Sequence, residues 1–305
     1  MLIFSHIGVL SDHYIMYYFY FPIFLVISGF FFPLGLERMQ FIKNRVTKIL
    51  YPFLFFYVIS YILFYIGMSI APEIMQTEAC SITDVFTQRQ WFNGPIWYLL
   101  CLFWLNLWLY VISKVSDKIL VQIICVLIVG YIGSYLGKRY FFLPMMIDAS
   151  FSALPFFYLG YILKSSWIFY PNRYDKYGMI IGALLLSIVL VLVCFFPDNW
   201  IGFHTNTIIG NYFVSLFISS IAVISVIYLC KSIRTLPFLT FFGMYSIVPF
   251  SVHHLIYRPL IVMFSLTGMD NVLIPVAILT VVVSALLIPV FKNYFPWAIG
   301  LKKRM

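Results

Sequence analysis

Charged residues are scarce in this sequence. Only 10% of its 305 residues are Asp, Glu, Lys or Arg, whereas 63% are apolar. Soluble domains contain about 25% charged and about 45–50% apolar residues, so this chain has too few charges to cover a surface in water. Hydrocarbon is the solvent that suits such a composition. The sequence therefore excludes a soluble globular domain and predicts an integral membrane protein.

Cysteine is present without a disulfide or metal-binding pattern. No CxxC pair and no Cys/His ligand spacing occurs among the five cysteines, so we expect neither a disulfide framework nor a metal site. Four of them lie inside apolar runs, where we expect small buried hydrophobic side chains. These are Cys101, Cys125, Cys194 and Cys230, and Cys80 lies in a loop. The N-terminus also lacks the basic flank of a cleavable signal peptide.

Long apolar runs predict an all-α polytopic fold with about ten membrane helices, in one membrane-embedded domain over residues 1–305. The first run is too short to span the hydrocarbon alone, so either the first helix is short or the chain begins inside it and lacks its N-terminal part. The predicted spans are 1–10, 14–36, 49–71, 95–112, 119–137, 149–164, 178–197, 206–230, 238–265 and 271–291.

The net charge of +9 comes from basic residues that follow this map. With an inside N-terminus and alternating loops, fifteen of the 19 basic residues fall on the inner side and only Arg89, Lys138 and Arg139 on the outer side. Asp12, Glu73, Glu78, Asp84, Asp148, Asp198 and Asp270 collect outside. Because Lys and Arg set membrane topology in this way, we predict cytoplasmic termini in a bacterial cytoplasmic membrane, and no nucleic-acid partner.

Titratable side chains within membrane spans are the first candidates for chemistry, because a central charge costs about 2.5–3.5 kcal/mol to insert. His6 lies in the first run, and His253 and His254 lie in the ninth. Arg258 follows His254 by four residues, so the two share a helical face. Each histidine could instead hydrogen-bond a neighbouring helix, or it could act as a proton acceptor near neutral pH.

A basic cluster precedes the third span in ERMQFIKNRVTK, residues 37–48. Arg45 and Lys48 are three residues apart, hence on one face of an α-helix, and Pro52 follows near the start of the span. An arginine fork and a lysine point charge suit phosphate groups. The same charges would also retain the segment inside and contact anionic membrane lipid.

The order of five motifs resembles the acyltransferase-3 family of membrane glycan O-acyltransferases. Phe4-Ser5-His6 is similar to the family's first-helix histidine, and FPIFLVISGFFF, with Ser28, to its second helix. RVTKILYP, which begins at Arg45, resembles the basic run ending in proline, with Lys48 in place of arginine. Trp97-Tyr98-Leu99 resembles the Trp-Phe-Leu motif, and SIVPFSVH, ending at His253, the late histidine motif.

This resemblance implies a membrane O-acyltransferase without a bound cofactor. It would move an acyl group, most often acetyl, from cytoplasmic acyl-coenzyme A to a hydroxyl of a surface or lipid-linked glycan. His6 would deprotonate that hydroxyl or relay the acyl group, and Arg45 and Lys48 would hold the coenzyme A phosphates. Ser28, Trp97, His253, His254 and Arg258 would line the site.

Three departures from the family pattern accompany the resemblance. The basic residue that the family carries eleven positions before the histidine would precede Met1. Tyr20-Phe21 replaces a His-Met pair, and Pro249-Phe250 interrupts the late motif. Ten spans with intramembrane histidines also fit a transporter or flippase for a lipid-linked sugar or other solute, although the two similar halves common in transporters are not apparent. An assembly subunit without catalysis is the third interpretation.

Overall fold

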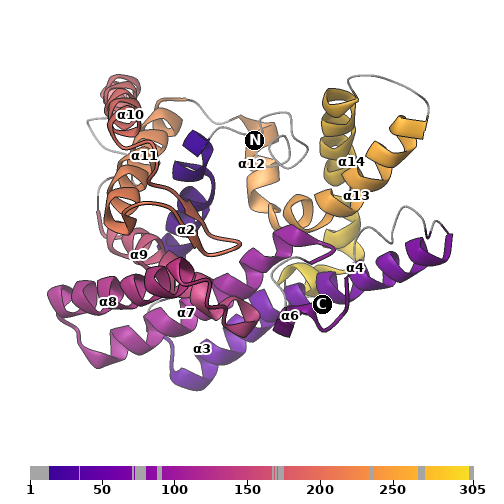
Figure 1. The fold of residues 1–305 in the computed structure, drawn as a ribbon, viewed down its shortest axis with the longest axis horizontal. Coiled ribbons are helices and arrows are strands. Elements are labelled where there is room, and N and C mark those ends of the chain that lie inside the picture. Colours follow the sequence, from indigo (N-terminus) through magenta and orange to yellow (C-terminus); the bar gives the residue numbers. More distant parts are fainter. Residues whose placement is uncertain are drawn as a thin grey trace. The chain divides into compact units, whose positions relative to one another are not determined.

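The computed structural model describes residues 14–33, 35–70, 72, 80–87, 91–166, 168, 170, 175–233, 236–266 and 272–301. These residues are mostly helical, and one short antiparallel hairpin joins β1 to β2 (Figure 1). Eight of the described helices are long and apolar enough to cross a membrane, and a shorter apolar helix covers Ile15–Phe30. The predicted all-α polytopic membrane fold is confirmed.

The chain folds into two compact units. The described parts of Glu37–Leu100 and Leu236–Met305 form unit 1, and those of Tyr14–Leu36 and Cys101–Thr235 form unit 2.

Unit 1 contains α3 (Arg38–Arg45), η2 (Val46–Leu50), α4 (Tyr51–Ile70), α6 (Asp84–Thr87), η3 (Gly94–Ile96), α12 (Pro237–Met244), α13 (Ile247–Leu266), α14 (Leu273–Tyr294) and η6 (Pro296–Ile299). Unit 2 contains η1 (Tyr14–Tyr18), α2 (Tyr20–Phe30), α8 (Ile119–Lys138), η4 (Pro144–Met146), α9 (Ile147–Leu163), η5 (Asp175–Tyr177), α10 (Gly178–Phe195), β1 (Ile201–Gly202), β2 (Thr207–Ile208) and α11 (Tyr212–Ser232). Helix α7 (Trp97–Val115) begins in unit 1 and continues into unit 2.

Glycine lets two helices of unit 2 approach at their backbones. A Cβ on Gly160 of α9 would collide with the Val26 carbonyl of α2, and a Cβ on Gly29 of α2 would collide with the Phe157 carbonyl of α9. Small residues at a helix interface are how membrane helices gain packing contact where lipid supplies no hydrophobic drive. The pair of glycines therefore fixes α2 against α9.

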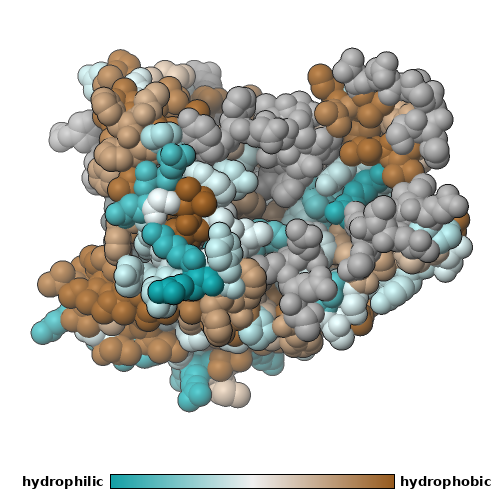
Figure 2. Space-filling view, viewed as in Figure 1, coloured by the Kyte–Doolittle hydropathy of each residue, from teal (hydrophilic) through white to brown (hydrophobic). Residues whose placement is uncertain are grey.

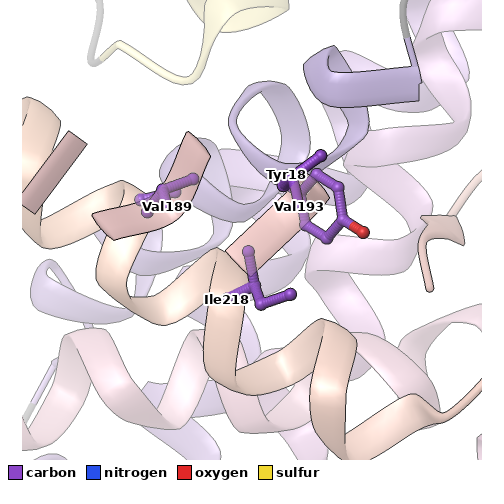
Figure 3. Close-up of a cluster of buried hydrophobic side chains, with 5 residues drawn as sticks. Tyr18, Val189, Val193 and Ile218 are labelled. Atoms are coloured by element: carbon purple, nitrogen blue, oxygen red, sulfur yellow. The ribbon is translucent and has the colours of Figure 1, made fainter. Parts of the chain in front are cut away.

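The remaining helices of unit 2 pack through a small apolar core. Tyr18 of η1 meets Val189 and Val193 of α10 and Ile218 of α11 (Figure 3). All four side chains are at most 2% exposed. Sequence alone gives no pairing for these residues, which lie far apart along the chain.

Large apolar side chains also cover the outside of the molecule. Figure 2 shows hydrophobic residues gathered over α8, where Ile124 and Ile128 are about half exposed. Leu184 of α10 and Leu286 of α14 are exposed to a similar degree. Exposed apolar area on this scale suits contact with lipid rather than water. Two cysteines lie on such surfaces, so the prediction of burial is wrong for Cys194 and Cys230, while Cys101 is buried.

The predicted ninth span, 238–265, is wrong as a single helix. Helix α12 ends at Met244, and α13 begins at Ile247. Pro249 explains the break, because its ring clashes with the carbonyl four residues earlier and it has no N–H to donate there. The residue four positions earlier is Tyr245, where the chain leaves the helix. Pro249 itself lies in the first turn of α13, where proline is tolerated.

Three other predicted spans differ at their ends. The third span, predicted as 49–71, continues a helical run that begins at Arg38. Residues 206–211 are not helical, because the hairpin reaches Ile208 and α11 starts only after Asn211, whose Oδ1 accepts from the Phe213 and Val214 amides. The second span, predicted as 14–36, is helical only to Phe30. The first predicted span, 1–10, lies outside the described residues.

Candidate active site

The basic cluster lies on one long helix that includes a π-helical turn. Helices α3 and α4 join through η2, which is a π-helix, into one run from Arg38 to Ile70. Pro52 accounts for the turn, because in an uninterrupted α-helix its missing amide would donate to the Lys48 carbonyl and its ring would clash there. Single π-turns within α-helices are frequent at functional sites.

Arg45 and Lys48 occupy different parts of this irregular stretch. Arg45 ends α3, is half-buried, and places its guanidinium carbon 5.8 Å from the centre of the Phe41 ring. Lys48 lies within the π-turn and is exposed. The sequence prediction of a shared face assumed α-helical spacing, which the structure does not have between these two residues.

A segment that was predicted as an outer loop returns along α4. We call the described residues of 80–94 the return segment. Tyr57 of α4 donates from its hydroxyl to the Ile82 carbonyl (2.8 Å) and accepts from the Val85 amide (3.1 Å). One turn later, the Tyr61 hydroxyl donates to Asp84 Oδ2 (3.3 Å), and Asp84 is only 1% exposed. Two tyrosines thus hold the return segment against the apolar part of the helix.

Aromatic stacking extends this attachment. The Trp91 ring lies 5.8 Å from the Phe53 ring and 5.6 Å from the Tyr57 ring, and its Nε1 donates to the Asp84 carbonyl. Phe92 meets Phe64 at 5.1 Å. Trp91 and Phe92 are buried, whereas Ile82 and Phe86 remain exposed. The part of the segment that leads into Asn93 is therefore the part that protein covers.

Asn93, near the end of the return segment, joins two helices by hydrogen bonds. Its Nδ2 donates to Ser60 Oγ of α4 (2.9 Å) and to the Ser251 carbonyl of α13 (2.8 Å). All three residues are buried, and Ser60 lies midway along α4. Asn93 Oδ1 and Ser251 Oγ are also buried, and neither has a hydrogen-bond partner among the described residues. A polar centre therefore lies inside unit 1 at the middle of a membrane-length helix.

The two late histidines lie beside this centre on α13. His253 is fully buried, and its Nδ1 donates to the Pro249 carbonyl (2.9 Å). Since a carbonyl can only accept, Nδ1 carries the proton and Nε2 is the basic nitrogen of the neutral ring. His254 Nε2 shares a hydrogen bond with the Tyr257 hydroxyl (3.2 Å), and its ring edge lies against Gly94.

Arg258 faces the return segment from the same side of α13 as His254. Its guanidinium carbon lies 5.3 Å from the centre of the Phe92 ring. Arg258 thus contacts Phe92, and His254 contacts Gly94 two residues later. Both side chains face the return segment, as their four-residue spacing on a helix predicts. An intramembrane arginine that faces protein rather than lipid is a functional candidate.

Comparison with known proteins identifies the fold family. A family model described as an acyltransferase domain, the acyltransferase-3 family, matches residues 1–292. The chain belongs to the acyltransferase-3 family. No curated protein and no solved structure matches it.

Family membership decides between the function classes that the sequence left open. An acyltransferase-3 protein is an enzyme that transfers acyl groups, so the chain is a membrane acyltransferase rather than a transporter or an assembly subunit. The match covers nearly the whole chain and includes every candidate residue named from the sequence.

Two of the other site residues predicted for this acyltransferase lie on other helices. Trp97 starts α7 and is 2% exposed, three residues after Gly94. Ser28 is half-buried on α2 in unit 2. His6 lies outside the described residues. The structure thus places His254 and Arg258 against residues 92–94, with the His253 ring 5.2 Å from the His254 ring, while Arg45 and Lys48 precede α4. Among the described residues, no cluster of three His, Cys, Asp or Glu could hold a metal ion.

Sequence reasoning missed the residues of the polar centre. Ser60 and Ser251 carry no charge within an apolar run, and Asn93 was assigned to an outer loop. The Asn-Gly-Pro at 93–95 marks a turn, which sequence reading places at a membrane surface by default. A buried amide in that turn has no sequence signature of its own.

Proposed function

We propose that this acyltransferase moves an acetyl group from cytoplasmic acetyl-coenzyme A to a hydroxyl of a surface or lipid-linked glycan. One observation supports this more than any other. The basic residues Arg45 and Lys48 and the polar centre at Ser60 lie along the same helix. Ser60 follows Lys48 by twelve residues, which corresponds to roughly 18 Å along a helix axis.

That separation suits the shape of the donor. Coenzyme A carries its nucleotide phosphates at one end and its thioester at the other, with an extended arm between them. Phosphates held by Arg45 and Lys48 would leave the acyl group free to reach the polar centre. Burial there limits hydrolysis of the thioester by water.

His6 is the proposed catalytic base. Its neutral imidazole takes the proton of the acceptor hydroxyl, and the oxygen attacks the thioester carbonyl carbon. The C–S bond then breaks, and the departing thiolate takes the proton from the imidazolium, so the histidine returns to its neutral form. General-base help of this kind contributes about 10²–10⁴ in rate.

Orientation in the membrane follows from the basic residues. In the predicted topology, fifteen of the 19 fall on the same side as Arg45 and Lys48, which supports cytoplasmic termini and a cytoplasmic donor site in the bacterial cytoplasmic membrane. Accessibility labelling of a cysteine at position 118 tests this. Labelling from outside would contradict the orientation.

The donor site is tested in purified, reconstituted protein with labelled acetyl-coenzyme A and a glycan acceptor. Truncating a charged contact to phosphate costs about 2 kcal/mol, so Arg45→Ala and Lys48→Ala should each raise the donor KM about thirtyfold while the acceptor KM is unchanged. Arg38→Ala is the matched control, since Arg38 is an exposed basic residue on α3 of the same helix. Equal effects in all three variants would mean that the cluster provides only general positive charge.

His6→Ala tests the base separately. Transfer should fall to background while donor affinity and membrane insertion are retained, because alanine suits a membrane helix at least as well as histidine. Near-normal transfer by this variant would remove His6 from the mechanism.

A further inference from the structure

The end of the described chain forms a short ordered segment beside α4. We call residues 295–301 the C-terminal segment, the last part of the yellow ribbon next to α4 in Figure 1. It contains η6, followed by Gly300 in the left-handed region with φ +73°. The Gly300 amide donates to the Trp297 carbonyl, and the Leu301 amide donates to the Pro296 carbonyl. The segment therefore has its own hydrogen-bonded turn.

Aromatic packing attaches this segment to the first turn of α4. The Phe55 ring lies 5.0 Å from the Trp297 ring and 6.2 Å from the Phe295 ring. Ala298 and Ile299 are buried. These contacts lie immediately after the π-turn in the chain.

Gly300 meets the π-turn itself. A Cβ at Gly300 would lie 3.0 Å from the Lys48 carbonyl oxygen and 3.3 Å from the Lys48 Cα, so only glycine fits without displacing the backbone. This is the carbonyl that loses its α-helical donor because Pro52 has no N–H. Proline thus opens the helix at Lys48, and the C-terminal segment packs over the opening.

We propose that the C-terminal segment positions Lys48 for the donor phosphates, with Gly300 and Pro52 as positioning residues. This inference rests on the proposed donor site. The π-turn sets where Lys48 projects relative to Arg45, and the contact with Gly300 holds that turn. The ligand class is the phosphate groups of an acyl-coenzyme A.

The first test compares two glycines with the same backbone conformation. Gly35 has φ +74° and no atom within 4 Å of its Cβ position, so Gly35→Ala introduces the strain of a left-handed residue without a contact. Gly300→Ala introduces the same strain and also displaces Lys48. We expect Gly300→Ala to raise the donor KM by about tenfold, the effect of losing 1.4 kcal/mol of binding, with an unchanged acceptor KM. Gly35→Ala should leave both values unchanged.

The second test separates positioning from stability. Pro52→Ala restores the missing amide donor and favours a regular α-helix, so the melting temperature should stay the same or rise. The donor KM should nevertheless rise about tenfold, because Lys48 then leaves its π-helical position. A merely structural role for Pro52 predicts no increase in donor KM.

Different failures have different meanings. If Lys48→Ala raises the donor KM but Gly300→Ala and Pro52→Ala do not, the positioning inference is wrong and the donor site stands. If Lys48→Ala leaves the donor KM unchanged, the donor site is wrong and the positioning inference falls with it. Equal increases for Gly300→Ala and Gly35→Ala would also overturn the inference, because strain alone would then explain the effect.

Discussion

Unit 1 buries Asn93 and unit 2 buries Asn206, and the hydrogen bonding of these two side-chain amides differs. In unit 2, Asn206 uses all of its polar atoms: Oδ1 accepts from Ser152 Oγ (2.6 Å), and Nδ2 donates to the Gly133 carbonyl (3.0 Å) and to Asp148 Oδ2 (3.1 Å). In unit 1, Asn93 uses only Nδ2, and its Oδ1 has no partner among the described residues. Both residues are at most 1% exposed.

The difference separates a structural network from a candidate active site. Most buried polar atoms in proteins are satisfied, and an unsatisfied one costs about 1–3 kcal/mol. In unit 2 the Asn206 amide avoids this cost, because it is paired with Asp148 where the hairpin meets α8 and α9. In unit 1 the Asn93 Oδ1 atom has no such pairing among the described residues, and it lies next to the residues that His254 and Arg258 contact. Unsatisfied or strained groups are often found at functional sites.

The largest expected effect is a steric break in unit 2. Gly160→Ala should destabilise the protein by at least about 3 kcal/mol, because the new Cβ would collide with the Val26 backbone rather than with a flexible side chain. Thermal unfolding in detergent would measure this. Gly243→Ala is the control, since nothing lies within 4 Å of its Cβ position. Similar stability of the two variants would contradict the close contact of α2 and α9.

Asn206→Ala should cost up to about 3 kcal/mol of stability, because three hydrogen bonds are lost and Asp148 is left buried without this donor. The donor and acceptor KM values of the remaining folded enzyme should not change. A selective loss of acceptor binding would show that the network of unit 2 takes part in the chemistry, and the contrast between the two asparagines would then fail.

Asn93→Ala should cost about 2 kcal/mol of stability, since two hydrogen bonds to α4 and α13 are lost. It should also lower kcat at least about tenfold, because this tie sets the distance between the two helices at the polar centre. Stability and single-turnover transfer are measured on the same preparation. Lower stability with a normal kcat would make Asn93 the equivalent of Asn206.

Ser251→Ala has the smallest expected effect on stability, and with the opposite sign. Its hydroxyl is buried and has no partner in the part of the chain that the structure describes, so removing it should leave the melting temperature unchanged or raise stability by about 1 kcal/mol. The Ser251 carbonyl still accepts from Asn93 in this variant. A marked destabilisation would mean that the hydroxyl has a partner and that the centre is closed like the network in unit 2.

The sequence predicted the membrane class and most helices, because long apolar runs admit few other structures in lipid. It failed where an apolar run changes direction. Pro249 interrupts the run 238–265 where Ser246 is the one strongly polar residue between the two helices and no charge marks the break. The return segment carries the Asn and Asp that are typical of exposed loops. Local chemistry identified His254 and Arg258 on one face of a helix, since helical spacing is a local property. The partners of Asn93 are 33 and 158 residues away in the sequence, so no local pattern contains them.

The return segment also bears on how the enzyme can be tagged. Connections between membrane helices are usually the places where an epitope, a fluorescent protein or a cleavage site can be inserted. Here Ile82 and Asp84 are hydrogen-bonded to Tyr57 and Tyr61 of α4. An insertion at this point would break these bonds and displace the residues that lead to the polar centre. The connection after α10 is better suited to carry a tag, because Phe195 and Phe196 are exposed and the turn precedes the hairpin. Two connections of similar polarity thus differ in what can be built into them.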